Sequence, residues 1–154
     1  MEDPILSESD RAEVQKLFGA ITGDVFVDLY TKRTTIVIPG EESEDDAGPV
    51  TEQLLGEVAG LSPHIKLTVH DATTDPEDAR TEGVEGFIPA IVFRNATSKG
   101  KLRYFGLPAG YEFKTLIDTL VSLGANDSHL SEESRADLAK VTKPVNLKVY
   151  VTPG

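Results

Sequence analysis

The chain has 154 residues, and its 26 acidic and 15 basic side chains give a net charge of −11. It contains no cysteine, which excludes disulfides, thiolate nucleophiles, redox dithiols and cysteine-ligated metal ions within these residues. The hydrophobic share of 39% is enough for one packed core, while the acidic balance argues against a nucleic-acid partner and no apolar run is long enough to predict a membrane span.

The first residues, Met1-Glu2-Asp3-Pro4, carry two acidic side chains and show no apolar leader, so we expect a cytoplasmic protein. Ser7 followed three residues later by Asp10 predicts the start of a helix. Apolar residues then recur at helical spacing as far as Ile21. Alternation over residues 25–30 predicts a strand, and residues 34–38 predict a further extended run.

An acidic stretch, residues 41–48, follows and is typical of a solvated loop, since its spacing does not match that of a calcium-binding loop. The acidity of the chain as a whole fits either ordinary solubility or adaptation to concentrated salt. Pro49 suits the first turn of a helix, and Gly60 suits its end. The apolar side of that helix is predicted to hold Leu54, Leu55, Val58 and Ala59.

The second half of the chain predicts a sheet and a closing helix. Residues 65–70 alternate as in a strand, whereas residues 73–85 are polar and show no strong period. Residues 87–93 form a continuous apolar run typical of a buried strand, which we expect to form a hairpin with residues 101–105. An amphipathic helix should follow and end at Gly124. The order predicts an α/β fold with helices on both faces of the sheet.

The end of the chain repeats its beginning. Leu6-Ser7-Glu8 recurs as Leu130-Ser131-Glu132, and Arg11-Ala12 recurs as Arg135-Ala136. Chance similarity of two amphipathic helices is one explanation, but we favour duplication. Residues 1–125 would then form one complete unit, and residues 129–154 the opening helix and strand of a second, truncated unit. The apolar strand Val145–Val151 would lack a sheet of its own, which predicts self-association.

Three segments carry a resemblance to a known family: residues 53–62, 86–90 and 102–113. With them the chain resembles the glutaredoxin-like protein disulfide oxidoreductases, which hold two thioredoxin-fold units in tandem. It is more distantly similar to the N-terminal domain of the alkyl hydroperoxide reductase flavoprotein. The resemblance implies a thioredoxin-like fold, a central mixed sheet flanked by helices. Residues 149–153 look like the approach to a Cys-x-x-Cys of the second unit.

The resemblance also implies where a site would lie. Ile88-Pro89 would be a cis peptide bond, and both residues would bind an extended polypeptide substrate through the backbone before the proline. The dithiol positions hold Asp45-Asp46-Ala47-Gly48, a degenerate site at which no disulfide exchange can occur. No catalytic residue is therefore expected. The histidines His64, His70 and His129 match no ligand motif, so neither a metal nor a cofactor is expected.

Three functional interpretations remain open at this stage. The first is a redox-inactive unit that supports thiol–disulfide exchange by a cysteine-bearing partner unit. The second is a fragment of an enzyme whose reading frame continues into a Cys-x-x-Cys. The third is a free-standing polypeptide-binding module or a duplicate without function. The expected partners are an extended polypeptide, a second thioredoxin-like unit, or another copy of this chain.

Overall fold

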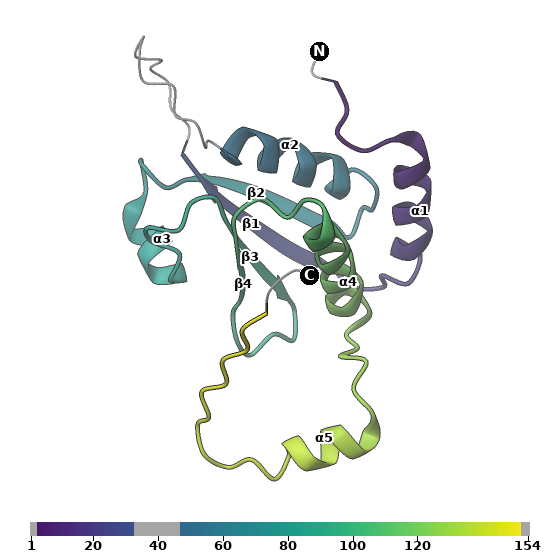
Figure 1. Cartoon of the computed structure of the whole chain (residues 1–154), viewed down its shortest axis with the longest axis vertical. Coiled ribbons are helices and arrows are strands. Elements are labelled where there is room, and N and C mark those ends of the chain that lie inside the picture. The colour runs from purple at the N-terminus through teal and green to yellow at the C-terminus, as the bar shows by residue number, and fades with distance from the viewer. Residues whose placement is uncertain (1–2, 33–46, 152–154) are drawn as a thin grey trace.

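The computed structural model describes residues 3–32 and 47–151, and it is built around a sheet of four strands (Figure 1). The strand order is β2-β1-β3-β4, with β1 parallel to β2, β3 antiparallel to β1, and β4 antiparallel to β3. The strands are β1 (Val25–Thr31), β2 (Ile65–Asp71), β3 (Ala90–Asn95) and β4 (Leu102–Phe105). The helices are α1 (Glu8–Phe18), α2 (Ala47–Ala59), α3 (Pro76–Glu82), α4 (Tyr111–Ala125) and α5 (Glu132–Leu138). The predicted mixed sheet flanked by helices is confirmed.

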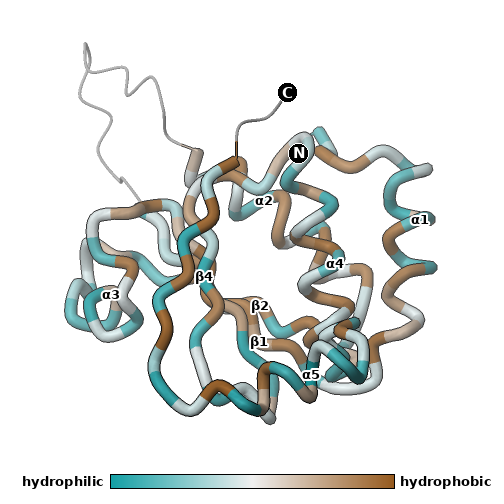
Figure 2. Tube along the Cα trace, turned by 60° about the horizontal axis from the view of Figure 1, so that its bottom comes forward, coloured by the Kyte–Doolittle hydropathy of each residue, from teal (hydrophilic) through white to brown (hydrophobic). Residues whose placement is uncertain are grey.

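The two faces of the sheet are covered differently. Because side chains alternate along a strand, Val25, Val27 and Leu29 of β1 point to one face, where they form the main core with α1, α2 and α4. The other face carries a smaller cluster in which Tyr30 and Val92 pack against α3. Figure 2 shows hydrophobic residues along β1, β2 and α4.

Helix α1 begins as its sequence predicts. The side chain of Ser7 accepts a hydrogen bond from the backbone N–H of Asp10 at 3.1 Å, and the backbone N–H of Ser7 donates to the Asp10 carboxylate at 3.3 Å. This reciprocal pair satisfies two N–H groups that the first turn would otherwise leave unpaired.

Helix α3 was not predicted, because residues 73–85 have no apolar period. The residues that favour this helix lie at its two ends. Asp75 accepts a hydrogen bond from the N–H of Asp78, Pro76 occupies the first turn, and Gly83 ends the helix at φ 71°. Strand β3 also begins later than expected, at Ala90 rather than Phe87. Pro89 has no N–H to give to a ladder, so strand pairing starts only after it.

The C-terminal part of the described chain differs from the prediction in one respect. Helix α5 forms, but the structure contains no strand over residues 145–151, which are extended and highly exposed. A strand needs a hydrogen-bonded neighbour for its N–H and C=O groups, and none of the described strands pairs with this segment. The division into units 1–125 and 129–154 stays a prediction.

Two other expectations concern residues outside the described ranges, the extended run at 34–38 and the acidic residues up to Asp46. Within the described ranges, no helix is both long and apolar enough to cross a bilayer.

Candidate functional site

Three of the four predicted site residues, Gly48, Ile88 and Pro89, lie at the carboxyl end of β1. The β1–α2–β2 crossover places the first turn of α2, and with it Gly48, at this end of the sheet (Figure 1). Ala90 pairs with Tyr30 near the end of β1, so the preceding residues Ile88 and Pro89 reach the same end. Asp45 lies outside the described residues. The roles given to these four residues from the sequence stay predictions.

The backbone of Ile88 is open at this end. The Ile88–Pro89 peptide bond is cis, and the Pro89 carbonyl accepts the N–H of Gly106 at 2.8 Å. Within residues 3–32 and 47–151, nothing hydrogen-bonds the N–H or the carbonyl of Ile88. These groups can therefore pair with another extended backbone, as unpaired groups at sheet edges do.

A pocket of about 180 Å³ lies beside Ile88. It is bounded by the ends of β1 and β2, the start of α3 and the loop before Pro89, and it is lined by Lys32, Ala72, Pro76, Ala79, Glu85, Gly86 and Ile88. Cavities that bind drug-sized molecules or cofactors hold about 300–1,000 Å³. The pocket is therefore of a size to receive a single side chain.

Two aromatic rings extend the apolar surface near Ile88. Phe87 is 61% exposed and Phe105, at the end of edge strand β4, is 47% exposed. Their ring centroids lie 5.1 Å apart and the ring planes are tilted by 52°. Such tilted pairs are a favourable aromatic arrangement, and this one leaves much of both rings accessible to another molecule.

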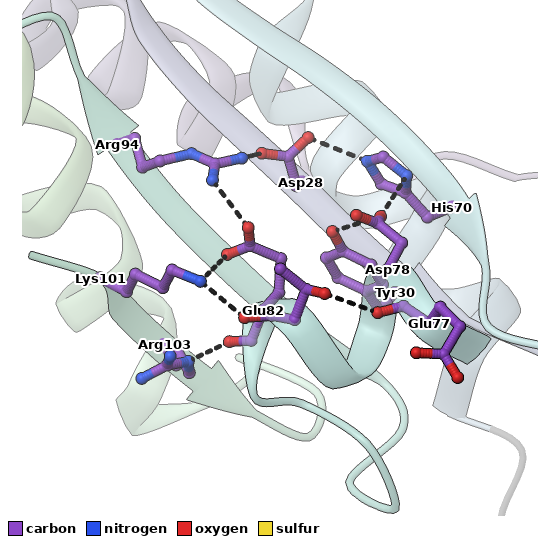
Figure 3. Close-up of polar contacts among 10 residues, drawn as sticks. Asp28, Tyr30, His70, Glu77, Asp78, Glu82, Arg94, Lys101 and Arg103 are labelled. Carbon is purple, nitrogen blue, oxygen red and sulfur yellow. Dashed lines mark hydrogen bonds and ion pairs between the residues drawn. The ribbon is translucent and has the colours of Figure 1, made fainter. Parts of the chain in front are cut away.

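Polar side chains support the site from the α3 face of the sheet (Figure 3). His70 lies between two carboxylates, with Nε2 2.9 Å from Asp28 Oδ1 and Nδ1 3.4 Å from Asp78 Oδ2. The Tyr30 ring stacks on His70 at 4.6 Å, and its hydroxyl donates to Asp78 at 2.8 Å. Burial and the Asp78 carboxylate raise the pKa of Tyr30 far above its usual value, so the phenol stays protonated and keeps donating.

Arg94 connects this group to the far end of α3 (Figure 3). Its guanidinium pairs with Asp28 and with Glu82, the latter at 3.2 Å. Desolvation alone would lower the pKa of Arg94, but the hydrogen bonds and charges of both carboxylates together raise it. Glu82 Oε2 is engaged by the charge of Lys101 Nζ at 3.2 Å without hydrogen-bond geometry, and the Glu82 carbonyl accepts from Arg103 Nε at 2.6 Å. These contacts fasten α3 to β1, β3 and the β3–β4 hairpin.

The arrangement is suited to binding. Gly48 offers no side chain at the start of α2, and the partly exposed His70 side chain is held between Asp28 and Asp78. Across the two described ranges, no three His, Asp or Glu side chains are grouped so that they could hold a metal ion. What the site presents is an open backbone, a pocket for one side chain and an exposed aromatic pair.

Sequence reasoning missed the residues that shape this site around Ile88. The pocket depends on α3, which has no apolar period, and the aromatic pair joins residues 18 positions apart (105 − 87) through the hairpin. One signal was available: Asp28 interrupts an otherwise apolar strand, and a carboxylate buried there requires basic partners.

No family model matches the chain, and no curated protein matches it. Several solved structures, however, are similar to the chain. An alkylhydroperoxide reductase from Enterococcus faecalis matches with a TM-score of 0.71 and 20% identity over 88% of this chain and 60% of its own. A protein disulfide oxidoreductase from Aeropyrum pernix matches with a TM-score of 0.68 and 23% identity over 92% of this chain and 56% of its own.

These likenesses show that the chain has a thioredoxin fold. The chain spans less than two thirds of the length of either structure.

Proposed function

We propose that this chain is a redox-inactive thioredoxin-fold unit that supports thiol–disulfide exchange by a cysteine-bearing partner unit. Its contribution is to hold an extended polypeptide beside Ile88. The observation that carries the proposal is the open Ile88 backbone at the carboxyl end of β1, in a thioredoxin fold whose chain has no cysteine.

The exchange itself must belong to another unit. Thiol–disulfide exchange proceeds by attack of a thiolate on a disulfide sulfur through a mixed disulfide. No residue of this chain can form that intermediate, because the chain has no cysteine. The similar structures are those of a protein disulfide oxidoreductase and an alkylhydroperoxide reductase, which supports redox chemistry in a partner unit.

The surroundings of Ile88 favour an extended polypeptide as the bound molecule. Its N–H and carbonyl would provide backbone hydrogen bonds, which give affinity without regard to sequence. The pocket and the exposed rings of Phe87 and Phe105 would provide selectivity, because burying an apolar side chain there removes its surface from water. We therefore expect a preference for polypeptides with bulky apolar side chains, as unfolded proteins expose.

The test is a fusion of the chain, through its C-terminal end, to a dithiol-bearing thioredoxin domain. We measure kcat/KM for reduction of an unfolded protein disulfide and of a small-molecule disulfide, each with and without the fused chain. Tethering a binding site raises the local substrate concentration, so kcat/KM for the protein disulfide should rise at least about tenfold. The value for the small disulfide should not change. An equal change for both substrates, or none, would contradict the proposal.

A matched pair of variants locates the effect. Phe87→Ala removes a ring at the site, whereas Phe26→Ala removes a similarly exposed ring near the opposite end of β1. The first should abolish most of the gain in kcat/KM, and the second should leave it. A gain that Phe26→Ala abolishes and Phe87→Ala leaves would place binding elsewhere on the fold.

A further inference from the structure

The two ring nitrogens of His70 both face carboxylates. Nε2 lies 2.9 Å from Asp28 of β1, and Nδ1 lies 3.4 Å from Asp78 of α3. A neutral imidazole has one N–H and one lone pair, whereas the imidazolium has two N–H groups and a positive charge. A neutral ring that donates to Asp28 therefore turns its lone pair toward the negative carboxylate of Asp78. Only the charged ring is attracted to both carboxylates.

The groups around His70 allow the ring to lose its proton within the fold. The Tyr30 ring of β1 stacks on it and donates its hydroxyl to Asp78 at 2.8 Å (Figure 3). Arg94 of β3 pairs with the second oxygen of Asp28. Each carboxylate thus keeps another donor when the charge of His70 is lost. The His70 side chain is 29% exposed, so protons can reach it from water.

Asp78 connects His70 to the pocket beside Ile88. Its neighbour in α3, Ala79, is buried in the smaller apolar cluster, and Ile88 packs against the same cluster. Pro76 and Ala79 both line the pocket. The first turn of α3 is therefore one wall of the pocket, and Asp78 ties this turn to the sheet.

The opposite end of α3 is held by basic groups of another kind. The Glu82 carboxylate pairs with Arg94 and with Lys101, each at 3.2 Å, and Arg103 donates to the Glu82 carbonyl at 2.6 Å. Arginine and lysine ordinarily keep their charge well above pH 8, whereas histidine changes its charge between pH 5 and 8. A change of pH in this range therefore acts on the pocket end of α3 and leaves the far end fastened.

We infer that His70 is a positioning residue for the binding site beside Ile88, and that its charge sets the place of the pocket wall. The charged ring draws Asp78 and the first turn of α3 against the sheet, where this turn closes one side of the pocket. Loss of the proton removes that attraction and releases the turn. An extended polypeptide should therefore bind more tightly at pH 6 than at pH 8.5. The inference rests on the proposed function, because the binding site is the same.

The first measurement is the Kd of a labelled peptide of about ten residues with a central phenylalanine, for the full chain at pH 6 and at pH 8.5. The Kd should rise about three- to tenfold between these values, since apparent affinity falls with the fraction of the chain in the binding-competent state. His70→Gln has no charge at this position, so it should bind at both pH values with the weaker parental affinity.

His64→Gln is the matched control. The His64 ring also lies beside a carboxylate, 3.0 Å from Asp24, but at the opposite end of β2 from His70. This variant should keep the full pH dependence of the parent. A pH dependence that persists in His70→Gln, or that His64→Gln removes, would overturn the inference.

His70→Lys separates an effect of charge from an effect on folding. Lysine stays positive at both pH values, so this variant should bind with the tighter parental affinity throughout. If Gln and Lys at this position bind equally weakly, the role of His70 is merely structural and the inference is wrong. Should neither variant fold, Asp78→Asn takes their place: its amide accepts from Tyr30 and donates to the neutral ring, so its Kd should not change with pH.

Hydrogen exchange of the free chain tests the inference without any peptide. Because intrinsic exchange rates vary with pH, the parent is compared with His70→Lys at the same pH. The α3 amides should exchange equally in both at pH 6, and at least about threefold faster in the parent at pH 8.5. Equal rates at both pH values would overturn the inference even if the peptide binds. If the rates differ as expected and the peptide binds at neither pH, the proposed function fails while the control of α3 by His70 stands.

Discussion

The two faces of the sheet are held by different forces, although the same strands form both. On one face, Val25, Val27 and Leu29 pack against three helices in a large apolar core. On the other face, Asp28 and Tyr30 of the same strand join His70 and Arg94 in a network of polar contacts under the short helix α3.

The difference shows where specificity is located in this fold. Apolar burial is non-directional and tolerates many arrangements, so the α1, α2 and α4 face mainly supplies stability. Hydrogen-bonded charges require particular partners at particular distances, and here they fix α3, which forms one wall of the pocket beside Ile88. We therefore expect the first face to dominate unfolding and the second to shape the site.

The largest expected effect is on the apolar face. Leu29 is fully buried, so Leu29→Ala should lower the free energy of unfolding by about 2–5 kcal/mol, through lost burial and the cavity left behind. Leu17→Ala, at a half-exposed position of α1, is the control and should cost less than about 1 kcal/mol. Denaturant unfolding measures both. Equal costs would mean that the main core does not govern stability.

The polar face should give a smaller loss. Asp28→Ala removes a largely buried carboxylate that pairs with His70 and Arg94, and should cost about 1–3 kcal/mol. Asp118→Ala breaks an exposed pair with Lys114 and should cost less than about 0.5 kcal/mol. Hydrogen exchange of the α3 amides should speed up in Asp28→Ala alone. A change spread evenly over all helices would contradict a role confined to α3.

At the rim of the apolar face, Arg11 of α1 forms an ion pair with Glu57 of α2 whose contribution to stability depends on pH. The pKa of Glu57 is lowered in the folded state, so its carboxylate stabilises the fold above the ordinary glutamate pKa of about 4.3. This contribution disappears as the pH falls through the lower, folded-state value. Glu57→Gln should cost about 1 kcal/mol at pH 7 and progressively less on acidification. A cost that is the same at pH 7 and pH 3 would rule out this carboxylate as the source.

The exposed segment Val145–Val151 belongs to neither face, and its effect should be the smallest. Its apolar side chains are 73–87% exposed wherever they are described. We predict weak, concentration-dependent self-association, because an unpaired extended apolar segment can pair with another copy. Sedimentation velocity should detect it, and Leu147→Asp should remove it. A single monomeric species at high protein concentration would count against this prediction.

The sequence predicted the apolar face better than the polar one, for a physical reason. Periodic apolar residues such as Val14 and Leu54 reveal which side of a helix is buried, without knowledge of its partner. Helix α3 has no such period, and the contacts of Asp78 and Glu82 depend on residues up to about fifty positions away, so they could not be inferred. The role of Pro89 was inferred from the family resemblance. The contact of Phe105 with Phe87 and the pocket beside Ile88 could not be inferred, because they depend on how the β3–β4 hairpin and α3 fold.

Binding beside Ile88 is best tested by mapping where this unit meets an extended polypeptide. A peptide of about ten residues with a central phenylalanine is titrated into the ¹⁵N-labelled chain, and the amide shifts are followed by NMR. We predict that the shifts centre on Phe87, Ile88 and Gly106 and extend to the residues that line the pocket. Shifts centred between α1 and α4, or no shifts up to millimolar peptide, would contradict polypeptide binding at this site.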